Sequence, residues 1–287
     1  MGSKIVRADQ LGPSGLLDVP PAWAGLPTGR PLVMAILNVT PDSFSDGGLH
    51  ADPVAAGRLM HDQGADIVDV GGESTRPGAA EVDAETERAR VLPVVAALAR
   101  AGVVVSIDTR HAATMAAALD AGARIVNDVS GLAFDPGAAA LARIRGAPVV
   151  VMHMRGTPQT MQRMSDYGDV AQDVTAALAG RLARLGLAPG QAAIDPGIGF
   201  AKGPGDSAAL LARLPVLLNL GCRVLVGASR KGFIGHLTGE TRADARDAGS
   251  LAAAIVAVLG GAAILRVHDV PSTVQGLRVW HGLMAAG

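Results

Sequence analysis

Eight short apolar runs recur along this chain, and polar residues follow each of them at once. A strand that is buried on both faces reads as a continuous apolar run, which is typical of parallel sheets. Segments rich in helix-forming residues separate the runs, so strand and helix alternate along the chain. The predicted strands are Val33–Leu37, Asp66–Val70, Val103–Ile107, Arg124–Val126, Pro148–Met152, Ala192–Ile194, Val224–Val226 and Ala262–Leu265.

Eight parallel strands joined by right-handed crossovers predict an α/β fold of the (β/α)8 TIM-barrel type. The 287 residues fit one such barrel, which we place at residues 31–287 as a single domain. Residues 1–30 are rich in Gly and Pro, and we expect an N-terminal extension that ends in a short strand over the barrel floor. Asp108-Thr109 is a natural N-cap for the third helix. The predicted helices are Ala51–Gly64, Ala84–Ala101, Ala112–Ala121, Asp169–Leu187, Ser207–Leu220, Ala243–Gly260 and Ser272–Met284.

The composition narrows the class of protein. Apolar residues make up 49% of the chain but aromatic residues only 2%, so the core must consist of branched aliphatic residues and Ala. A formal net charge of -1 argues against nucleic acid or a membrane as the main partner. The single cysteine, Cys222, allows no internal disulfide and is expected to be a buried core residue. The longest apolar stretch, Leu251–Leu259, is too short to span a bilayer, and no signal peptide is evident, so we expect a soluble, cytoplasmic protein.

Cationic side chains follow the strand-like runs and should meet at one face, because the carboxyl ends of barrel strands share a rim. Arg266 and His268 occupy alternate positions and therefore point to the same side of the last strand. Together with Arg76 and Lys231 they predict a polyanion site, and Arg230 adds further positive charge. Each of these residues alone could equally be a solvated surface cation.

Short acceptors end three of the middle strands: Asp108, Asn127 and Asp195. A carboxylate can accept two N–H donors from a 2-amino-4-oxo-pyrimidine edge, and an amide can both donate and accept beside it. The three residues therefore favour a pocket for a pterin-like or guanine-like ring, in which a wrong ligand would leave buried polar groups unpaired. Taken singly, each could instead be a helix cap or a turn residue.

The first polar loop, Asn38–His50, carries an amide, two carboxylates and several hydroxyls. Such hard oxygen ligands suit Mg²⁺, although the loop alone favours a solvated turn. Two other long loops, Gly71–Asp83 and Arg155–Tyr167, lie on the same face. His153 is expected to be a hydrogen-bonded core histidine rather than a ligand.

Eight segments together resemble the dihydropteroate synthases, from about residue 32 to about residue 280. The first two segments are long and highly specific, and the shorter ones fall in the order found in that family. They are Ile36–Gly48, Asp69–Gly78, Ser106–Thr109, Val126–Gly131, Met152–Met154, Asp195–Lys202, Val226–Lys231 and Arg266–Asp269.

The resemblance implies an enzyme that joins p-aminobenzoate to 6-hydroxymethyl-7,8-dihydropterin diphosphate and releases diphosphate, with Mg²⁺ as cofactor. Asn38 would hold Mg²⁺, and diphosphate would be held by Thr75, Arg76, Arg266 and His268. The pterin would be held by Asp108, Asn127, Asp195 and Lys231. The aminobenzoate site would be formed by Ser229, Phe44, Pro77, Phe200 and Lys231. The residues expected to act in catalysis are Asp108, Lys231, Arg266 and His268.

Relatives of this kind are usually homodimers, and they are either targets of sulfonamides or sulfonamide-insensitive variants. The chemistry suggests a loose, cation-like transition state, so Arg266→Ala should cost about 10²–10³ in rate with the fold intact. Three alternatives are weaker: a folate-dependent methyltransferase, which needs no diphosphate clamp, a Schiff-base aldolase using Lys231 or Lys202, and a pterin-binding protein without activity.

Overall fold

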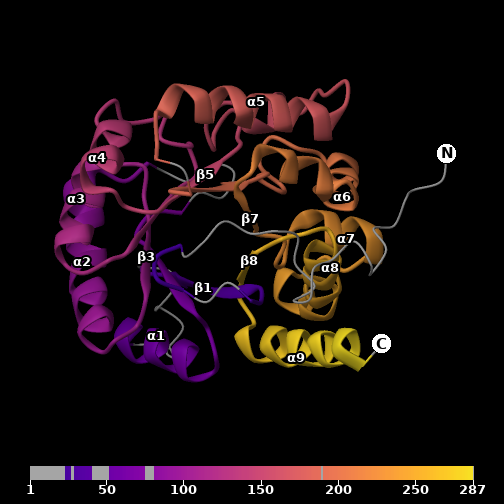
Figure 1. The fold of residues 1–287 in the computed structure, drawn as a ribbon, viewed down its shortest axis with the longest axis horizontal. Coiled ribbons are helices and arrows are strands. Elements are labelled where there is room, and N and C mark those ends of the chain that lie inside the picture. Colours follow the sequence, from indigo (N-terminus) through magenta and orange to yellow (C-terminus); the bar gives the residue numbers. More distant parts are fainter. Residues whose placement is uncertain (1–22, 27–28, 41–51, 75–80, 189, 287) are drawn as a thin grey trace.

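Eight parallel strands close into a barrel whose neighbours follow chain order, β1 to β8, with β8 pairing back to β1 (Figure 1). The structure is a computed structural model, and it describes residues 23–26, 29–40, 52–74, 81–188 and 190–286. Helices surround the strands on the outside of the barrel (Figure 1). The predicted (β/α)8 fold is confirmed. The strands are β1 (Leu32–Asn38), β2 (Ile67–Gly71), β3 (Val105–Asp108), β4 (Ile125–Asp128), β5 (Val149–Met152), β6 (Ala192–Asp195), β7 (Arg223–Val226) and β8 (Ile264–Val267).

Three of the helices begin at an aspartate whose carboxylate accepts hydrogen bonds from the first-turn backbone amides: Asp52, Asp83 and Asp169. The α-helices are α1 (Pro53–Asp62), α2 (Ala84–Arg100), α3 (Ala112–Asp120), α4 (Ala138–Arg145), α5 (Val170–Leu185), α6 (Pro204–Ala212), α7 (Gly232–Thr238), α8 (Asp247–Leu259) and α9 (Val270–Ala286). Short 3-10 segments occur at η3 (Met161–Arg163), η4 (Leu214–Leu220) and η5 (Ala243–Ala245).

The helix predictions were wrong in three places. A single helix over Ser207–Leu220 is instead α6 followed by η4, because Pro215 has no N–H to continue the α-helical ladder. Helices α4 and α7 were not predicted. Pro136-Gly137 precedes α4 and reads as a turn, and α7 contains two glycines, which lower its helix propensity.

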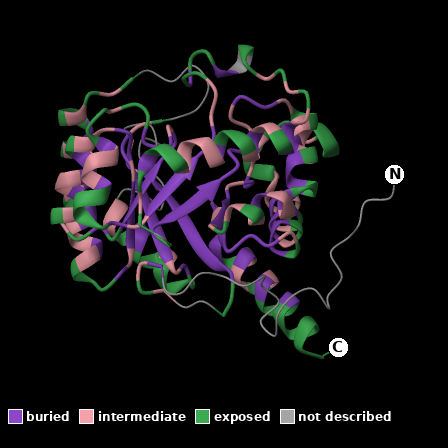
Figure 2. Cartoon of the chain, turned by 45° about the horizontal axis from the view of Figure 1, so that its top comes forward, coloured by how far each residue is buried: buried purple, intermediate pink, exposed green. Residues whose placement is uncertain are grey.

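The barrel has two apolar layers, one between strands and helices and one inside the barrel. Alternate side chains of a strand share a face, so Leu32 and Met34 of β1 both point into the interior. Figure 2 shows the strands as a continuous buried centre with exposed residues on the outer helix faces. The interior cluster consists of Trp23, Leu32, Met34, Ile67, Ile125, Val150, Ala193, Leu225, Ala263 and Ile264.

Trp23 closes the interior cluster at the amino-terminal end of the barrel. Its side chain is only 1% exposed, and its indole Nε1 donates to the carbonyl of Gln191 at 3.1 Å. The Gln191 amide in turn donates to two backbone carbonyls, at 2.8 Å each. The expected short strand is absent from the described part of the extension, where residues 23–26 form a turn. An indole ring therefore seals the barrel floor.

Two further expectations concern single features. Cys222 is partly rather than fully buried, and it packs against the outer apolar layer. In the part of the chain that the structure describes, no helix combines the length and the apolar character needed to cross a membrane.

Candidate active site

Four polar side chains extend the interior register of the barrel toward its carboxyl-terminal mouth. Each lies two residues after a member of the interior cluster, so it points inward above that apolar side chain. The four residues lie on β2, β4, β6 and β8, and alternate strands of such a barrel together supply one layer of inward-facing side chains. The pairs of interior and polar residue are Ile67 and Asp69, Ile125 and Asn127, Ala193 and Asp195, and Ile264 and Arg266.

Arg266, on β8, contacts carboxylates of β2 and β3, two strands that neighbour each other but not β8. Its Nε donates to Asp69 Oδ2 at 2.7 Å, and its Nη2 donates to Asp108 Oδ2 at 2.7 Å. Asn127 Nδ2 also donates to Asp69 Oδ2, at 2.9 Å. Strands β2, β3, β4 and β8 are thus tied together by one polar cluster. The predicted site residues Asp108, Asn127 and Arg266 are brought into a single network, with Asp69 at its centre.

The charges in this network do not balance, because two carboxylates share one guanidinium. Burial raises the pKa of Asp108; the charge of Arg266 opposes that rise and the carboxylate of Asp69 adds to it. The pKa of Arg266 is raised, since attraction to Asp69 and Asp108 outweighs its own burial. Asp69 Oδ1 is fully buried and has no hydrogen-bond partner among the described residues. The cluster therefore carries more buried negative charge than Arg266 alone neutralises.

Asp195 lies at the end of β6 and is only 6% exposed. Burial raises its pKa, and the Gly197 amide, which donates to Asp195 Oδ1 at 2.7 Å, partly offsets that effect. Gly197 has φ +68°, and a Cβ at this position would collide with the carbonyl oxygen of His153. A tight glycine turn thus places the Asp195 carboxylate at the barrel mouth.

Lys202 fixes the loop that follows β6 from inside the protein. Its Nζ lies 2.9 Å from His153 Nδ1 and donates to the carbonyls of Gly197 and Phe200, each at 3.0 Å. Burial lowers the pKa of Lys202 to about 7 and the pKa of His153 to about 3. His153 is therefore neutral and accepts from Lys202, as expected for a hydrogen-bonded core histidine.

The loops after β6 and β7 meet at the rim. Lys231 Nζ lies 4.1 Å from the centroid of the Phe200 ring, within range of a cation–π interaction. Ser229 is buried, and its Oγ lies 3.0 Å from His268 Nδ1 on the following strand. The predicted residues are thus adjacent in pairs, Phe200 with Lys231 and Ser229 with His268, which directly follows β8.

Two interpretations of the sequence need correction. Asp108 does not cap α3, which begins after His111 without a side-chain cap; the carboxylate is held by Arg266 instead. Arg230 adds no free cation to the rim, because Asp247 holds its guanidinium through two hydrogen bonds. Asp108 differs because it is buried against Arg266. Arg230 differs because Asp247, in the first turn of α8, pairs with it.

Asn38 ends β1 at the rim and is half-buried, beside Gly71 of β2. Within the described ranges, no three His, Cys, Asp or Glu side chains gather as metal ligands. The expectations for Phe44, Thr75, Arg76 and Pro77 fall outside the described residues.

Three polar residues were missed by the sequence reasoning: Asp69, Lys202 as a loop anchor, and Arg110. Asp69 could have been found, since it is a charged residue two positions after Ile67 in an apolar run. Arg110 pairs with Glu73 at 2.8 Å and stacks over Phe134, with its guanidinium carbon 4.0 Å from the ring centroid. No local sequence pattern signals that pairing.

Comparison with known proteins agrees with this geometry. The family model described as "Pterin binding enzyme" matches residues 34–268. Dihydropteroate synthase of Escherichia coli (strain K12) is 46% identical over 268 residues, which cover 91% of this chain and 94% of the relative. The chain belongs to the dihydropteroate synthase family.

Solved structures of this family superpose over most of the chain. Xanthomonas albilineans dihydropteroate synthase with 4-aminobenzoic acid has a TM-score of 0.85 at 45% identity, covering 91% of this chain and 97% of that one. The same organism's dihydropteroate synthase in complex with 7,8-dihydropteroate has a TM-score of 0.81 at 42% identity, covering 91% and 96%. The expected dihydropteroate synthase fold and family are thereby confirmed.

Proposed function

We propose that this member of the dihydropteroate synthase family condenses 6-hydroxymethyl-7,8-dihydropterin diphosphate with p-aminobenzoate, forming 7,8-dihydropteroate and releasing diphosphate. The observation that carries the proposal is the inward-facing row of Asp69, Asn127, Asp195 and Arg266 above a closed apolar interior. Buried acceptors at this depth match the N–H donors of a pterin ring, and they would be left unpaired by most other ligands. The named relatives support the same reaction.

The pterin site in this proposal uses Asp108, Asn127 and Asp195, with Lys231 at its edge. Asp69 supports them from beneath, because its Oδ2 accepts from both Asn127 and Arg266. Asp108 also stands near the developing positive charge on the reacting carbon, which its carboxylate would stabilise. Ser229 and Phe200 contribute to the aminobenzoate site at the rim.

The diphosphate site uses Arg266 and His268, together with Thr75 and Arg76 from the second loop. Within the described residues, the hydrogen bonds of Arg266 use Nε and Nη2, which leaves Nη1 for a diphosphate oxygen. The amine nitrogen of aminobenzoate attacks the pterin CH₂ carbon, the C–O bond to diphosphate breaks, and the amine loses a proton. An aromatic amine reacts unprotonated, so the step needs no strong base.

The residues present fit Mg²⁺ only when the phosphate groups of the substrate supply further ligands. Asn38 offers one amide oxygen at the rim, and Mg²⁺ commonly takes few protein ligands while binding substrate phosphates. When bound there, Mg²⁺ would neutralise charge on the departing diphosphate.

Diphosphate release on mixing the protein, Mg²⁺, pterin diphosphate and p-aminobenzoate tests the reaction. We expect release only when both substrates are present, together with a product that absorbs as a dihydropteroate. A repeat with a sulfonamide separates a sensitive from an insensitive synthase. No release from a folded protein that still binds pterin diphosphate would contradict the proposed reaction.

A homodimer is also proposed, on the basis of an apolar surface on the two last helices. Helices α8 and α9 pack together, and both expose large apolar side chains: Val256, Leu259, Val279, Leu283 and Met284. Such exposed side chains on neighbouring elements are typical of an interface. A cytoplasmic location is proposed as well, supported by the single cysteine.

A further inference from the structure

Arg230 stands between two residues of the proposed site and has a backbone conformation that its side chain disfavours. Its φ is +58°, in the left-handed region that non-glycine residues rarely adopt. Ser229 before it contacts His268, and Lys231 after it lies over Phe200. Strained residues of this kind persist only where the surrounding structure holds them.

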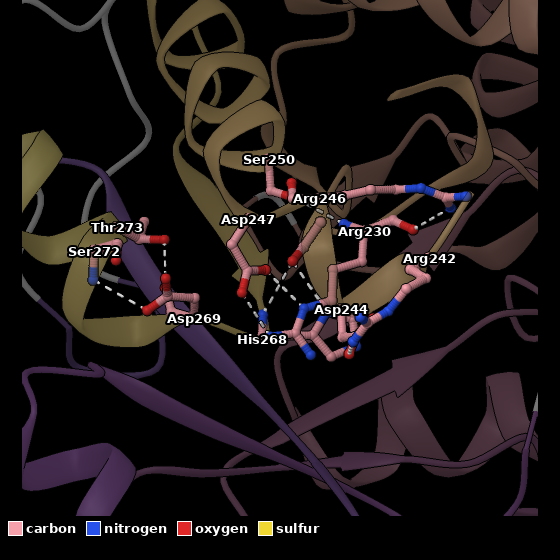
Figure 3. A network of polar contacts seen from close by, with 11 residues as sticks. Arg230, Arg242, Asp244, Arg246, Asp247, Ser250, His268, Asp269, Ser272 and Thr273 are labelled. Carbon is pink, nitrogen blue, oxygen red and sulfur yellow. Dashed lines mark hydrogen bonds and ion pairs between the residues drawn. The ribbon is translucent and has the colours of Figure 1, made fainter. Parts of the chain in front are cut away.

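The start of α8 holds the backbone of Arg230 on both sides. The Arg230 amide donates to Ser250 Oγ at 2.8 Å, and Ser250 Oγ donates in turn to the carbonyl of Arg246 at 2.7 Å. Arg246 Nη1 donates to the Arg230 carbonyl at 3.2 Å. Both peptide groups that flank this residue are therefore tied to the same helix end (Figure 3).

The side chain of Arg230 is held by the same helix. Its Nε donates to Asp247 Oδ1 at 2.7 Å, and its Nη2 donates to Asp247 Oδ2 at 2.8 Å. This parallel pair of bonds fixes the orientation of the guanidinium as well as its position. In Figure 3 the Asp247 and Arg230 side chains face each other.

We propose that Asp247 and Ser250 are positioning residues, which hold Arg230 in its left-handed conformation and so place Ser229 and Lys231 in the site. Arg230 then acts through its backbone, and its charge faces α8 instead of the substrate. The inference rests on the proposed function for its catalytic consequence, but the clamp itself is a structural claim that can be tested without turnover.

Exchanging Arg230 for Ala or for Gly separates the effect of its side chain from the effect of its left-handed backbone. Both variants lose the guanidinium, but only glycine adopts a positive φ without penalty. We expect Arg230→Ala to raise the KM for p-aminobenzoate roughly 5- to 30-fold, the factor that corresponds to the cost of a left-handed residue. Arg230→Gly should stay within about threefold of wild type in both KM and kcat.

A variant of Asp247, the partner of Arg230, tests the proposal independently. Asp247→Asn should resemble Arg230→Ala, and adding Arg230→Gly to it should restore the KM, because glycine needs no clamp. Asp244→Asn is the matched control, since that exposed carboxylate pairs with Arg242 close to the same network (Figure 3) and should leave the KM unchanged.

Amide hydrogen exchange at residue 230 provides the readout that does not depend on turnover. Exchange should accelerate roughly 5- to 30-fold in Arg230→Ala and Asp247→Asn but not in Asp244→Asn. Equal kinetic and exchange effects of Ala and Gly, or a wild-type Asp247→Asn, would overturn the clamp. An inactive wild type with the expected exchange pattern would instead count against the proposed reaction alone.

Discussion

Arg266 sets the electrostatics of the site at the scale of single residues. It is 22% exposed, whereas the two carboxylates that it joins, Asp69 and Asp108, are 0% and 11% exposed. Removing the cation would leave two buried carboxylates facing each other without compensation. The guanidinium therefore has a structural task besides the proposed contact with diphosphate, and the two tasks should separate experimentally.

Replacing Arg266 by Ala should lower kcat/KM by about 10²–10³. It should also cost about 3–5 kcal/mol of unfolding free energy, because a buried pair has lost one partner. The sequence-based expectation of an intact fold remains a prediction, which the unfolding measurement tests. Urea unfolding and diphosphate release measure the two effects, and the double variant Asp69→Asn/Arg266→Met should recover stability without activity. Wild-type turnover in Arg266→Ala would remove this residue from the mechanism.

Lys202 predicts a dependence of stability on pH. Burial lowers its pKa from 10.5 to about 7, so between these values the unfolded chain binds more protons than the folded one. Its contribution to stability is therefore greatest above pH 10.5 and is lost as the pH falls toward 7. Lys202→Met should remove this rise from denaturant-derived unfolding free energies between pH 7 and 10. Parallel curves for the variant and the wild type would show that the folded lysine titrates normally.

At the scale of elements, the strands could be predicted and several helices could not. The strands are buried on both faces, so an apolar run such as Val149–Met152 can be recognised as a strand from its own sequence. Helix α4 directly follows Pro136-Gly137 and α7 contains two glycines, so local sequence signals did not reveal either helix. The same limit applies to the site. Asp108, Asn127 and Asp195 follow from strand ends, whereas the pairing of Arg266 with Asp69 spans nearly 200 residues and depends on barrel closure.

The loop after β6 offers a prediction at this scale. Gly197→Ala should destabilise the protein by more than about 2 kcal/mol, since it combines a positive φ with a clash against the His153 carbonyl. Gly205→Ala in α6 is the control: no atom lies within 4 Å of the added Cβ, and helix propensity favours the change. Thermal unfolding of the two variants should shift in opposite directions. Equal melting temperatures would contradict the tight turn.

At the scale of the whole molecule, the described residues fill the barrel at its amino-terminal end and place polar side chains at its carboxyl-terminal end. The interior cluster and Trp23 fill the barrel below the polar row, while Asp195 and Asn127 lie deep and Phe200 lies at the rim. The pterin should therefore bind before the aminobenzoate. Calorimetry should detect tight p-aminobenzoate binding only when diphosphate or pterin diphosphate is present. Equally tight binding to the free protein would contradict this order.

The apolar surface of α8 and α9 predicts the assembly state. Val279 and Leu283 are 59% and 65% exposed, and they lie four residues apart on one side of α9. Val279→Glu/Leu283→Glu should convert a dimer into a monomer in sedimentation experiments. Ile144→Glu, which changes an exposed residue on α4, should not. A wild-type monomer at micromolar concentration would overturn the proposed interface.

The seal at the barrel floor also gives the protein an optical property. The chain has two tryptophans, and both are buried: Trp23 lies beneath the strands, and Trp280 on α9 belongs to the apolar layer between strands and helices. Their emission thus reports on two separate regions. A Trp280→Phe variant would fluoresce from the floor alone and follow opening of the barrel, and a Trp23→Phe variant would follow events at the C-terminal helix.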